Sequence, residues 1–166
     1  MKKIILLVTV AVTLSLNSFA QISAGGGLAF GTEAETVGIN LRGQYGITES
    51  IDGVVGFTFF FPKTDKQRLF TSTIETKTSM WSIDFDGHYN FAINDQFKVY
   101  PLAGLNITGA SVEINGSKSS DTEAGLNIGA GATYGFSDQL KAFAETKYTI
   151  GNYDQAVITL GVLYSF

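Results

Sequence analysis

The feature that most constrains this chain is a strict alternation of residue types, clearest from Trp81 to Ile93. Every second residue from Trp81 onward is apolar or glycine, whereas the residues between them, up to Asn90, are polar. A helix repeats about every 3.6 residues and would mix the two sets, but a β-strand places alternate residues on opposite faces. The pattern therefore predicts a strand with one apolar and one polar face.

The same alternation recurs along the chain and predicts eight strands. Each covers about 9 to 13 residues, which is longer than the usual strand of a soluble protein and suits a tilted crossing of a bilayer. The predicted strands are 22–30, 37–47, 51–61, 81–93, 97–107, 124–136, 140–150 and 156–166. An even number of such strands is typical of a closed antiparallel barrel.

The connections between the predicted strands alternate in length. Three are tight turns: Thr48-Glu49-Ser50, Asn94-Asp95-Gln96 and Ser137-Asp138-Gln139. Between them lie longer loops, above all 62–79 and 108–123, and the second contains an Asn115-Gly116 turn signal. The stretch from Arg68 to Lys77 is rich in threonine and β-branched residues, so it is able to extend its hairpin as a ribbon. Short turns at one end and longer loops at the other are typical of outer-membrane barrels.

Aromatic residues on the apolar faces gather near both ends of the predicted strands. Near the short turns these are Tyr45, Tyr89, Phe91, Phe97, Tyr134, Phe136, Tyr164 and Phe166. Near the longer loops they are Phe30, Phe57, Phe59, Phe61, Trp81 and Tyr148. The alternative is a secreted barrel whose aromatic residues line a ligand cavity, but two girdles favour a barrel that meets both interfaces of a membrane and turns its apolar face outward.

Composition excludes other classes. The chain is 45% hydrophobic, too apolar for a disordered protein. Beyond residue 20, the longest stretches without Asp, Glu, Lys or Arg are 99–112 and 124–137, too short for a membrane helix of about 20 residues. The absence of cysteine excludes disulfides and thiolate metal sites.

The first twenty residues predict a cleaved signal peptide, 1–20, followed by a barrel domain, 21–166. Lys2 and Lys3 precede an apolar run, and Ser18-Phe19-Ala20 places small residues before the cut. The alternative, a retained membrane anchor, fits less well because the run is short. After cleavage nine basic and 15 acidic residues remain, without a basic patch, so no nucleic-acid partner is expected.

The polar faces carry charges of both signs that a closed barrel would place inside. They are Arg42, Asp52, Asp84, Asp86, His88, Lys98, Lys141, Glu145 and Lys147. Buried charges are tolerated only when they are paired, so these residues predict an interior charge network. The other inward positions are largely glycine, asparagine and glutamine, which suits a barrel that its own side chains fill.

A chemical role for these residues is the alternative. Asp84, Asp86 and His88 follow one another at spacing two, so they are able to share a cation, but counter-charges for the interior lysines and arginine are the favoured interpretation. His88 has no serine two residues away, and nucleophilic catalysis needs a base held against a nucleophile. The sequence therefore predicts no enzyme, no catalytic residue, no metal and no cofactor.

The last strand carries the most specific motif: Ile158, Leu160, Val162, Tyr164 and Phe166 alternate to the end of the sequence. With Tyr-Pro-Leu-Ala-Gly-Leu at 100–105 and Tyr-Gly-Phe-Ser-Asp-Gln at 134–139, the chain resembles small outer-membrane barrels of the OmpX and OmpA-barrel type, in the outer membrane protein β-barrel domain family. The resemblance implies that these five residues form the signal that the barrel-assembly machinery reads.

Together these patterns predict an all-β protein, an eight-stranded antiparallel up-and-down transmembrane β-barrel. We expect a monomer surrounded by lipid in the bacterial outer membrane, with both termini in the periplasm. The expected role is structural or adhesive through loops 62–79 and 108–123, with an extracellular ligand or an added partner strand at 62–79. A narrow channel for ions or small solutes is the alternative, and a lipid-modifying enzyme a third.

Overall fold

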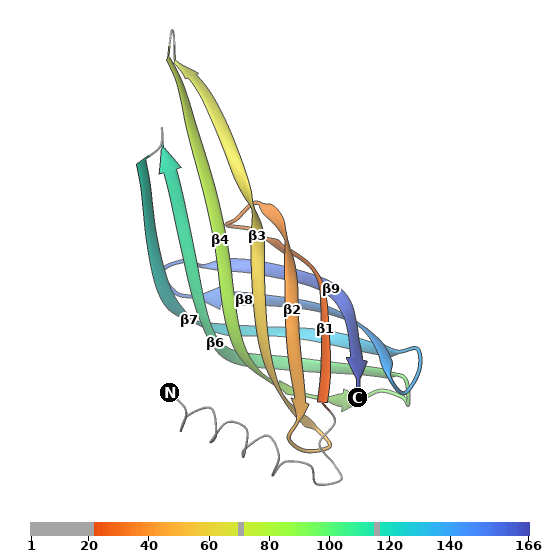
Figure 1. Cartoon of the computed structure of the whole chain (residues 1–166). Helices are drawn as coiled ribbons and strands as arrows, with labels where there is room; N and C mark the ends of the chain where they lie inside the picture. Colours follow the sequence, from red (N-terminus) through yellow and green to blue (C-terminus); the bar gives the residue numbers. More distant parts are fainter. Residues whose placement is uncertain (1–21, 70–71, 115–116) are drawn as a thin grey trace, which may run out of the picture.

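The computed structural model describes residues 22–69, 72–114 and 117–166, which form one antiparallel sheet closed into a barrel (Figure 1). The predicted signal peptide, 1–20, lies outside the described residues, and so does the predicted Asn115-Gly116 turn. In the described part of the chain, no helix is long and apolar enough to cross a membrane.

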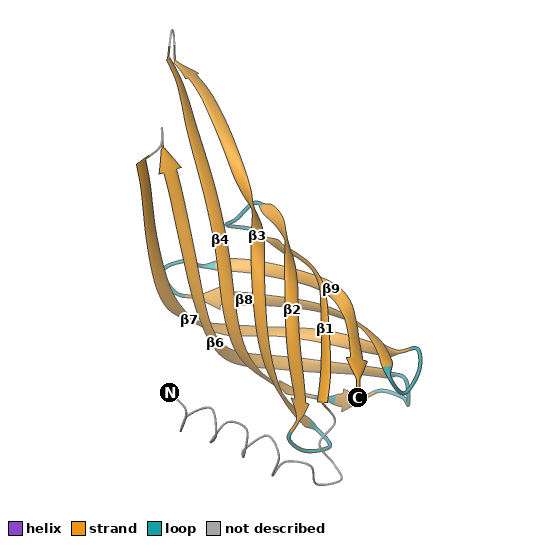
Figure 2. Cartoon of the chain, viewed as in Figure 1, coloured by secondary structure: helices purple, strands orange, loops and turns teal. Residues whose placement is uncertain are grey.

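Strands make up most of the described chain, and short turns and loops connect them (Figure 2). The strands are β1 (Ile22–Gly31), β2 (Thr36–Gly46), β3 (Ile51–Leu69), β4 (Ser72–Tyr89), β5 (Phe91–Ala92), β6 (Phe97–Ile114), β7 (Ser117–Gly135), β8 (Leu140–Ile150) and β9 (Gln155–Ser165). All of their pairings are antiparallel.

The barrel closes by pairing β1 with β9, from Ser23 opposite Ser165 to Gly31 opposite Val157. Both β4 and β5 pair with β6, so they form one barrel strand that is interrupted at Asn90. The nine strand segments of the described chain therefore make up eight barrel strands. This confirms the predicted fold class.

Two hairpins rise well beyond the rest of the barrel, one made by β3 and β4 and the other by β6 and β7 (Figure 1). The β2–β3 ladder ends at Gly38 opposite Phe60, whereas the β3–β4 ladder continues to Leu69 opposite Ser72. A β-bulge interrupts β3 between Phe60 and Lys63. This is where β3 leaves β2, and the intervening Pro62 has no N–H to donate to a ladder.

The predicted strand bounds were wrong at these hairpins. Segment 62–79 was expected as a loop in which Arg68 to Lys77 extends the hairpin as a ribbon; the ribbon is confirmed, but its ladder already begins at Lys63. Segment 108–123 was expected as a loop, but its described residues are strand. The fourth strand was expected to continue to Ile93, whereas the chain leaves the ladder at Asn90 and turns at 93–96. At that point the Asn90 backbone N–H donates to Ser50 O and its side chain donates to Asp52.

Alternate side chains point into and out of the barrel, and the outward set is apolar. Leu28 and Leu160 are about 60% exposed, and large apolar side chains of every long strand are exposed in the same way. A soluble monomer rarely exposes so large a continuous apolar surface, whereas the hydrocarbon of a membrane covers it.

Aromatic side chains on the outer surface contact one another in pairs two residues apart. Tyr134 with Phe136 and Tyr164 with Phe166 have ring centroids 5.3 Å apart in edge-on geometry at the end with the short turns. Phe59 and Phe61 form a similar pair at the other end. These six rings lie at the two ends of the barrel where the girdles were predicted.

The interior toward the long hairpins is closed by an apolar layer. Phe60 is completely buried there and packs with Met80, Ala29, Ala34 and Val157. These residues face inward and were not predicted as interior residues, because the inward positions of the sequence are mostly small or polar. The apolar layer seals the hairpin end of the lumen.

Candidate functional site in the barrel interior

The centre of the lumen is occupied by a bidentate ion pair between Arg42 of β2 and Glu145 of β8. Arg42 Nη1 lies 2.9 Å from Glu145 Oε2, and Arg42 Nη2 lies 3.0 Å from Glu145 Oε1. The guanidinium also lies over the Phe143 ring, 4.0 Å from its centroid. Both side chains are almost completely buried. Two residues 103 positions apart in the sequence meet because the barrel closes.

Tyr100 completes this group, and the sequence prediction did not include it. Its hydroxyl donates a hydrogen bond of 3.1 Å to Glu145 Oε2, and its ring stacks on His88 with centroids 4.3 Å apart. The sequence could have indicated it, because Tyr100 lies two residues after Lys98 and therefore on the same, inward face of β6.

His88 lies against this group without taking part in its hydrogen bonds. Its Nε2 is 3.7 Å from Glu145 Oε2 and, within the described residues, has no hydrogen-bond partner. The ring stacks on Tyr100, and a catalytic base would need a hydrogen bond to a nucleophile, which Nε2 does not make within the described residues. The arrangement is that of a packed interior side chain.

A second group lies beside the first and contains Asp84, Asp86 and Lys147. Lys147 Nζ is 2.8 Å from Asp84 Oδ2 and 3.3 Å from Asp86 Oδ2. Asn127 Nδ2 donates to both carboxylates, at 2.9 and 2.8 Å, and Asn106 Nδ2 donates to Asp84 at 2.6 Å. Ammonium and amide donors thus hold the oxygens that a cation would need, and in the described part of the chain no three acidic or histidine side chains are grouped to hold a metal ion.

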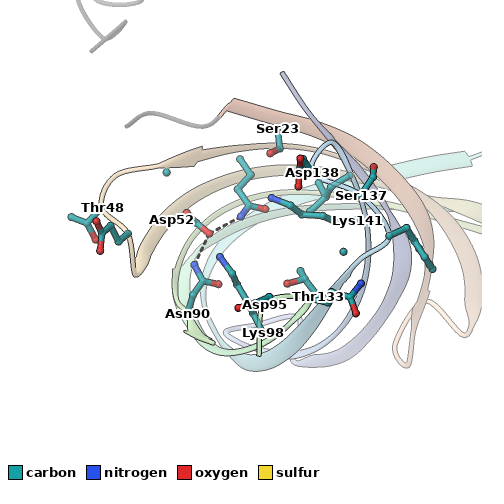
Figure 3. A pocket seen from close by; sticks show the side chains of 17 residues that line it. Ser23, Thr48, Asp52, Asn90, Asp95, Lys98, Thr133, Ser137, Asp138 and Lys141 are labelled. Carbon is teal, nitrogen blue, oxygen red and sulfur yellow. Dashed lines mark hydrogen bonds between the residues drawn. The ribbon is translucent and has the colours of Figure 1, made fainter. Parts of the chain in front are cut away.

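The remaining predicted interior residues, Asp52, Lys98 and Lys141, lie apart from both groups. They line a cavity of about 520 Å³ at the end with the short turns, which we call the vestibule (Figure 3). Gln44 and Asn90 each donate a hydrogen bond of 2.6 Å to Asp52 Oδ2. Of the nine predicted residues, six therefore gather in two groups at the centre of the lumen and three line the vestibule.

The five residues predicted as the assembly signal lie on the outer surface of β9 or directly after it. Ile158, Leu160, Val162, Tyr164 and Phe166 are all exposed there. The backbone N–H of Phe166 donates to Ile22 O, which joins the end of the chain to β1. Recognition of this strand by the assembly machinery stays a prediction.

Outside the barrel wall, one ion pair connects the β1–β2 loop to the β3 extension. Glu35 has a left-handed backbone, with φ of 47°, and its carboxylate binds Lys63 Nζ. The hydrogen bond and charge of Lys63 hold the pKa of Glu35 below its usual value. The contact joins the first loop to the base of the longer hairpin.

From the short turns inward, the lumen thus contains a polar vestibule, two groups of ion pairs and an apolar layer. The ion pairs satisfy buried charges, which is the condition under which an interior of low dielectric tolerates them. The lumen is therefore polar from the short turns to the ion pairs and reaches the apolar layer at Phe60.

The sequence model of a protein family described as "Outer membrane protein beta-barrel domain" matches residues 6–166. A search of curated proteins found no significant match.

Solved structures of similar fold include the N-terminal β-barrel domain of OprF from Pseudomonas aeruginosa, with 19% identity over 89% of this chain and 96% of that chain and a TM-score of 0.64. Neisserial surface protein A has 22% identity over 90% and 98%, with a TM-score of 0.63. Ail, the attachment invasion locus protein of Yersinia pestis, in complex with the heparin analogue sucrose octasulfate, has 19% identity over 89% and 97%, with a TM-score of 0.62. At these identities the likeness concerns the fold.

Proposed function

Because the chain belongs to the outer membrane protein beta-barrel domain family, we propose that it is a structural and surface-interaction protein of the bacterial outer membrane. The part that meets partners is the extended sheet, which we define as the described residues 61–69 and 72–79 of the β3–β4 hairpin and 108–114 and 117–123 of the β6–β7 hairpin. The filled lumen supports a role in which the barrel anchors this sheet and reinforces the envelope.

The proposal includes an orientation. The extended sheet lies outside the cell, and the short turns and both ends of the barrel domain face the periplasm. Barrels of the bacterial outer membrane generally have short periplasmic turns and longer extracellular segments, which supports this arrangement. In this barrel the connections at one end are short turns, whereas two long hairpins protrude from the other end (Figure 1).

The observation that carries the proposal is a pair of one-sided strand edges. The β7–β8 ladder begins at Leu126, so the described residues of β7 from Ser117 to Gly125 pair only with β6. On the opposite edge, β3 beyond Phe60 pairs only with β4. Backbone N–H and C=O groups on such edges are templates for a partner strand.

Charge supports backbone pairing as the mode of recognition. Segment 62–79 has four basic and two acidic residues, and segment 108–123 has one basic and three acidic residues. Five charges of each sign leave no strong field for a polysulfated ligand such as the one bound to Ail. An extended protein segment that adds to an edge is therefore the partner that we propose.

The test is a variant with both hairpins shortened in register. Replacing residues 65–76 with Asn-Gly joins Thr64 and Lys77, which pair in the ladder. Deleting 112–114 and 117–119 places the Asn115-Gly116 dipeptide between Ser111 and Ser120, which also pair. A two-residue Asn-Gly loop suits an antiparallel hairpin. Intact cells that express the shortened protein should adhere less to cultured epithelial cells than cells with equal surface amounts of the full chain.

Equal adhesion of the two strains at matched amounts would contradict the proposal. Orientation is tested separately, because the chain has no cysteine and a single introduced thiol is unique. A membrane-impermeant maleimide should label Lys118→Cys on whole cells, whereas Asp138→Cys in a short turn should react only after the outer membrane is opened. The reverse pattern would invert the orientation.

The polar vestibule is the observation that favours the second candidate, a narrow channel. The ion-pair groups and the apolar layer at Phe60 and Met80 oppose it, since ions would have to cross both. In planar bilayers we expect the full chain to be silent and Phe60→Ala to stay silent, because the ion pairs still fill the lumen. Steady openings of the full chain would favour transport.

We also propose that the protein carries out no chemistry on lipid. The mass spectrum of lipid A should be the same in cells that express the full chain and in cells that express His88→Ala. A mass change that disappears in the variant would assign an enzyme.

A further inference from the structure

The vestibule is a cavity with a polar wall that opens at the end of the barrel with the short turns. It lies between the short turns and the central ion pairs, and side chains of seven strands contribute to it (Figure 3). Its volume of about 520 Å³ lies within the range of small-molecule pockets, roughly 300–1,000 Å³. Gln44 of β2 and Thr133 of β7 provide neutral hydrogen-bonding groups on opposite walls.

The charges of the vestibule are arranged in two tiers. Lys98 of β6 and Lys141 of β8 belong to the wall, where both are partly buried, and the charges of Lys98 and Asp52 act on Lys141. The acidic residues Glu49, Asp95 and Asp138 lie in the short turns and form the rim. The wall therefore offers two cations, and the rim offers carboxylates.

The wall has one carboxylate, Asp52, for its two lysines. Its Oδ2 already accepts hydrogen bonds from Gln44 and Asn90, so amide donors compensate part of its charge. Two ammonium groups on neighbouring parts of a partly enclosed wall repel each other, and an anion between them relieves that repulsion. A simple anion would be repelled at the acidic rim, whereas a ligand that also has a cationic group would be attracted there.

We propose that the vestibule binds a small zwitterion, an amino acid or short peptide. Its carboxylate lies between Lys98 and Lys141, and its ammonium group faces the rim carboxylates. The mixed signs of the lining match this one chemistry in both tiers. The site lies at the opposite end of the barrel from the extended sheet, so it is independent of the adhesive role.

The test uses the full barrel domain in lipid nanodiscs with the dipeptide Ala-Ala as probe. Titration followed by amide NMR shifts should show saturable binding that moves the signals of Gln44 and Thr133. N-acetyl-Ala-Ala, which lacks the ammonium group, should bind at least about fivefold more weakly, and Ala-Ala-amide, which lacks the carboxylate, at least about tenfold more weakly.

Two variants and a matched control assign the site. Lys98→Met and Lys141→Met should each weaken Ala-Ala binding at least about tenfold, because each removes a charge-assisted hydrogen bond. Lys77→Met, on the extended sheet at the other end, should bind as the unchanged protein does.

Three results would overturn the proposal: no saturable shift at millimolar Ala-Ala, equal affinity for all three dipeptide forms, or unchanged binding in both vestibule variants. Unchanged spectra elsewhere in the barrel show that Lys98→Met and Lys141→Met remain folded. If one of them fails to fold, the dipeptide series on the unchanged protein still decides the question. Adhesion by the extended sheet is tested on cells, so either idea is able to fail alone.

Discussion

Removing one partner of the Arg42–Glu145 pair should be among the most destabilising single changes in the barrel. Glu145→Gln leaves a guanidinium whose side chain is 3% exposed without the carboxylate that holds it through bonds of 2.9 and 3.0 Å. Stranding one member of a buried pair typically costs about 3 to 5 kcal/mol. The Tyr100 hydroxyl loses a charged acceptor as well, so the cost should be at least about 3 kcal/mol.

A double-mutant cycle separates the pair from the stranded charge. Arg42→Met combined with Glu145→Gln removes both charges, so the double variant should lose about 2 kcal/mol less than the sum of the two single losses. Trp81 is the only tryptophan and lies on β4, so its fluorescence reports unfolding. The free energy of unfolding is measured by urea titration in lipid vesicles, at equal lipid ratios for all four proteins.

The reasoning would be refuted by a loss below about 1 kcal/mol for Glu145→Gln, or by strictly additive losses in the cycle. Either result would mean that water reaches the pair and that the centre of the lumen behaves as a surface. The barrel would then be wetter than its packing indicates, and conduction would gain support.

Three further predictions concern the wall and its surroundings. Gly161→Ala should cost about 1 to 3 kcal/mol of unfolding free energy in the same urea assay, because the added carbon would lie 2.4 Å from a backbone oxygen of β1. The control, Gly43→Ala, adds a carbon with nothing within 4 Å and should change the free energy by less than about 0.5 kcal/mol. Equal costs of the two changes would contradict close packing at Gly161. Phe57 lies opposite Leu41, the middle residue of β2, rather than in the girdle where it was predicted. Phe57→Lys should therefore cost about 2 to 4 kcal/mol of unfolding free energy, and Phe57→Leu less than about 1.5; a tolerated lysine would deny that the outer face meets lipid. The pKa of Glu35, measured by NMR, should lie below that of an ordinary glutamate and should rise toward it in Lys63→Gln. The contribution of this ion pair to stability is therefore present at neutral pH and is lost as pH falls through the lowered pKa. The same titration midpoint in both proteins would exclude the pair.

The alternation of residue types was enough to predict the barrel, its eight strands and which residues of each strand share a face. Residues of one strand follow each other at fixed spacing, so whether Asp84 shares a face with Asp86 is a local property. Which face meets lipid followed from the aromatic residues near both strand ends. The short turns were equally local, because Thr48 and Asn94 accept hydrogen bonds from backbone N–H groups two and three residues later.

The extent of the two long hairpins was not predictable from alternation. In segment 108–123 the alternation is short: Ala110, Val112 and Ile114 share one face of β6, but residues 117–123 on β7 are polar throughout, so no period of two marks that half as strand. Its pairing depends on the neighbouring hairpin, because Thr76 to Ser79 of β4 pair with Ser111 to Ile114 of β6. The extended sheet therefore exists through contacts between segments that are distant in the sequence.

Alternation along each strand sets which side chains face inward, whereas closure of the barrel sets how those side chains meet. Arg42 finds Glu145 rather than Asp84 because strand stagger and barrel closure set the height of each residue in the lumen, and a stagger cannot be read from any one strand. The same closure leaves Lys98 and Lys141 below the ion pairs, in the vestibule, and places Phe60 above them. Inward direction is a property of one residue and its neighbours, whereas partnership in the lumen is a property of the closed barrel.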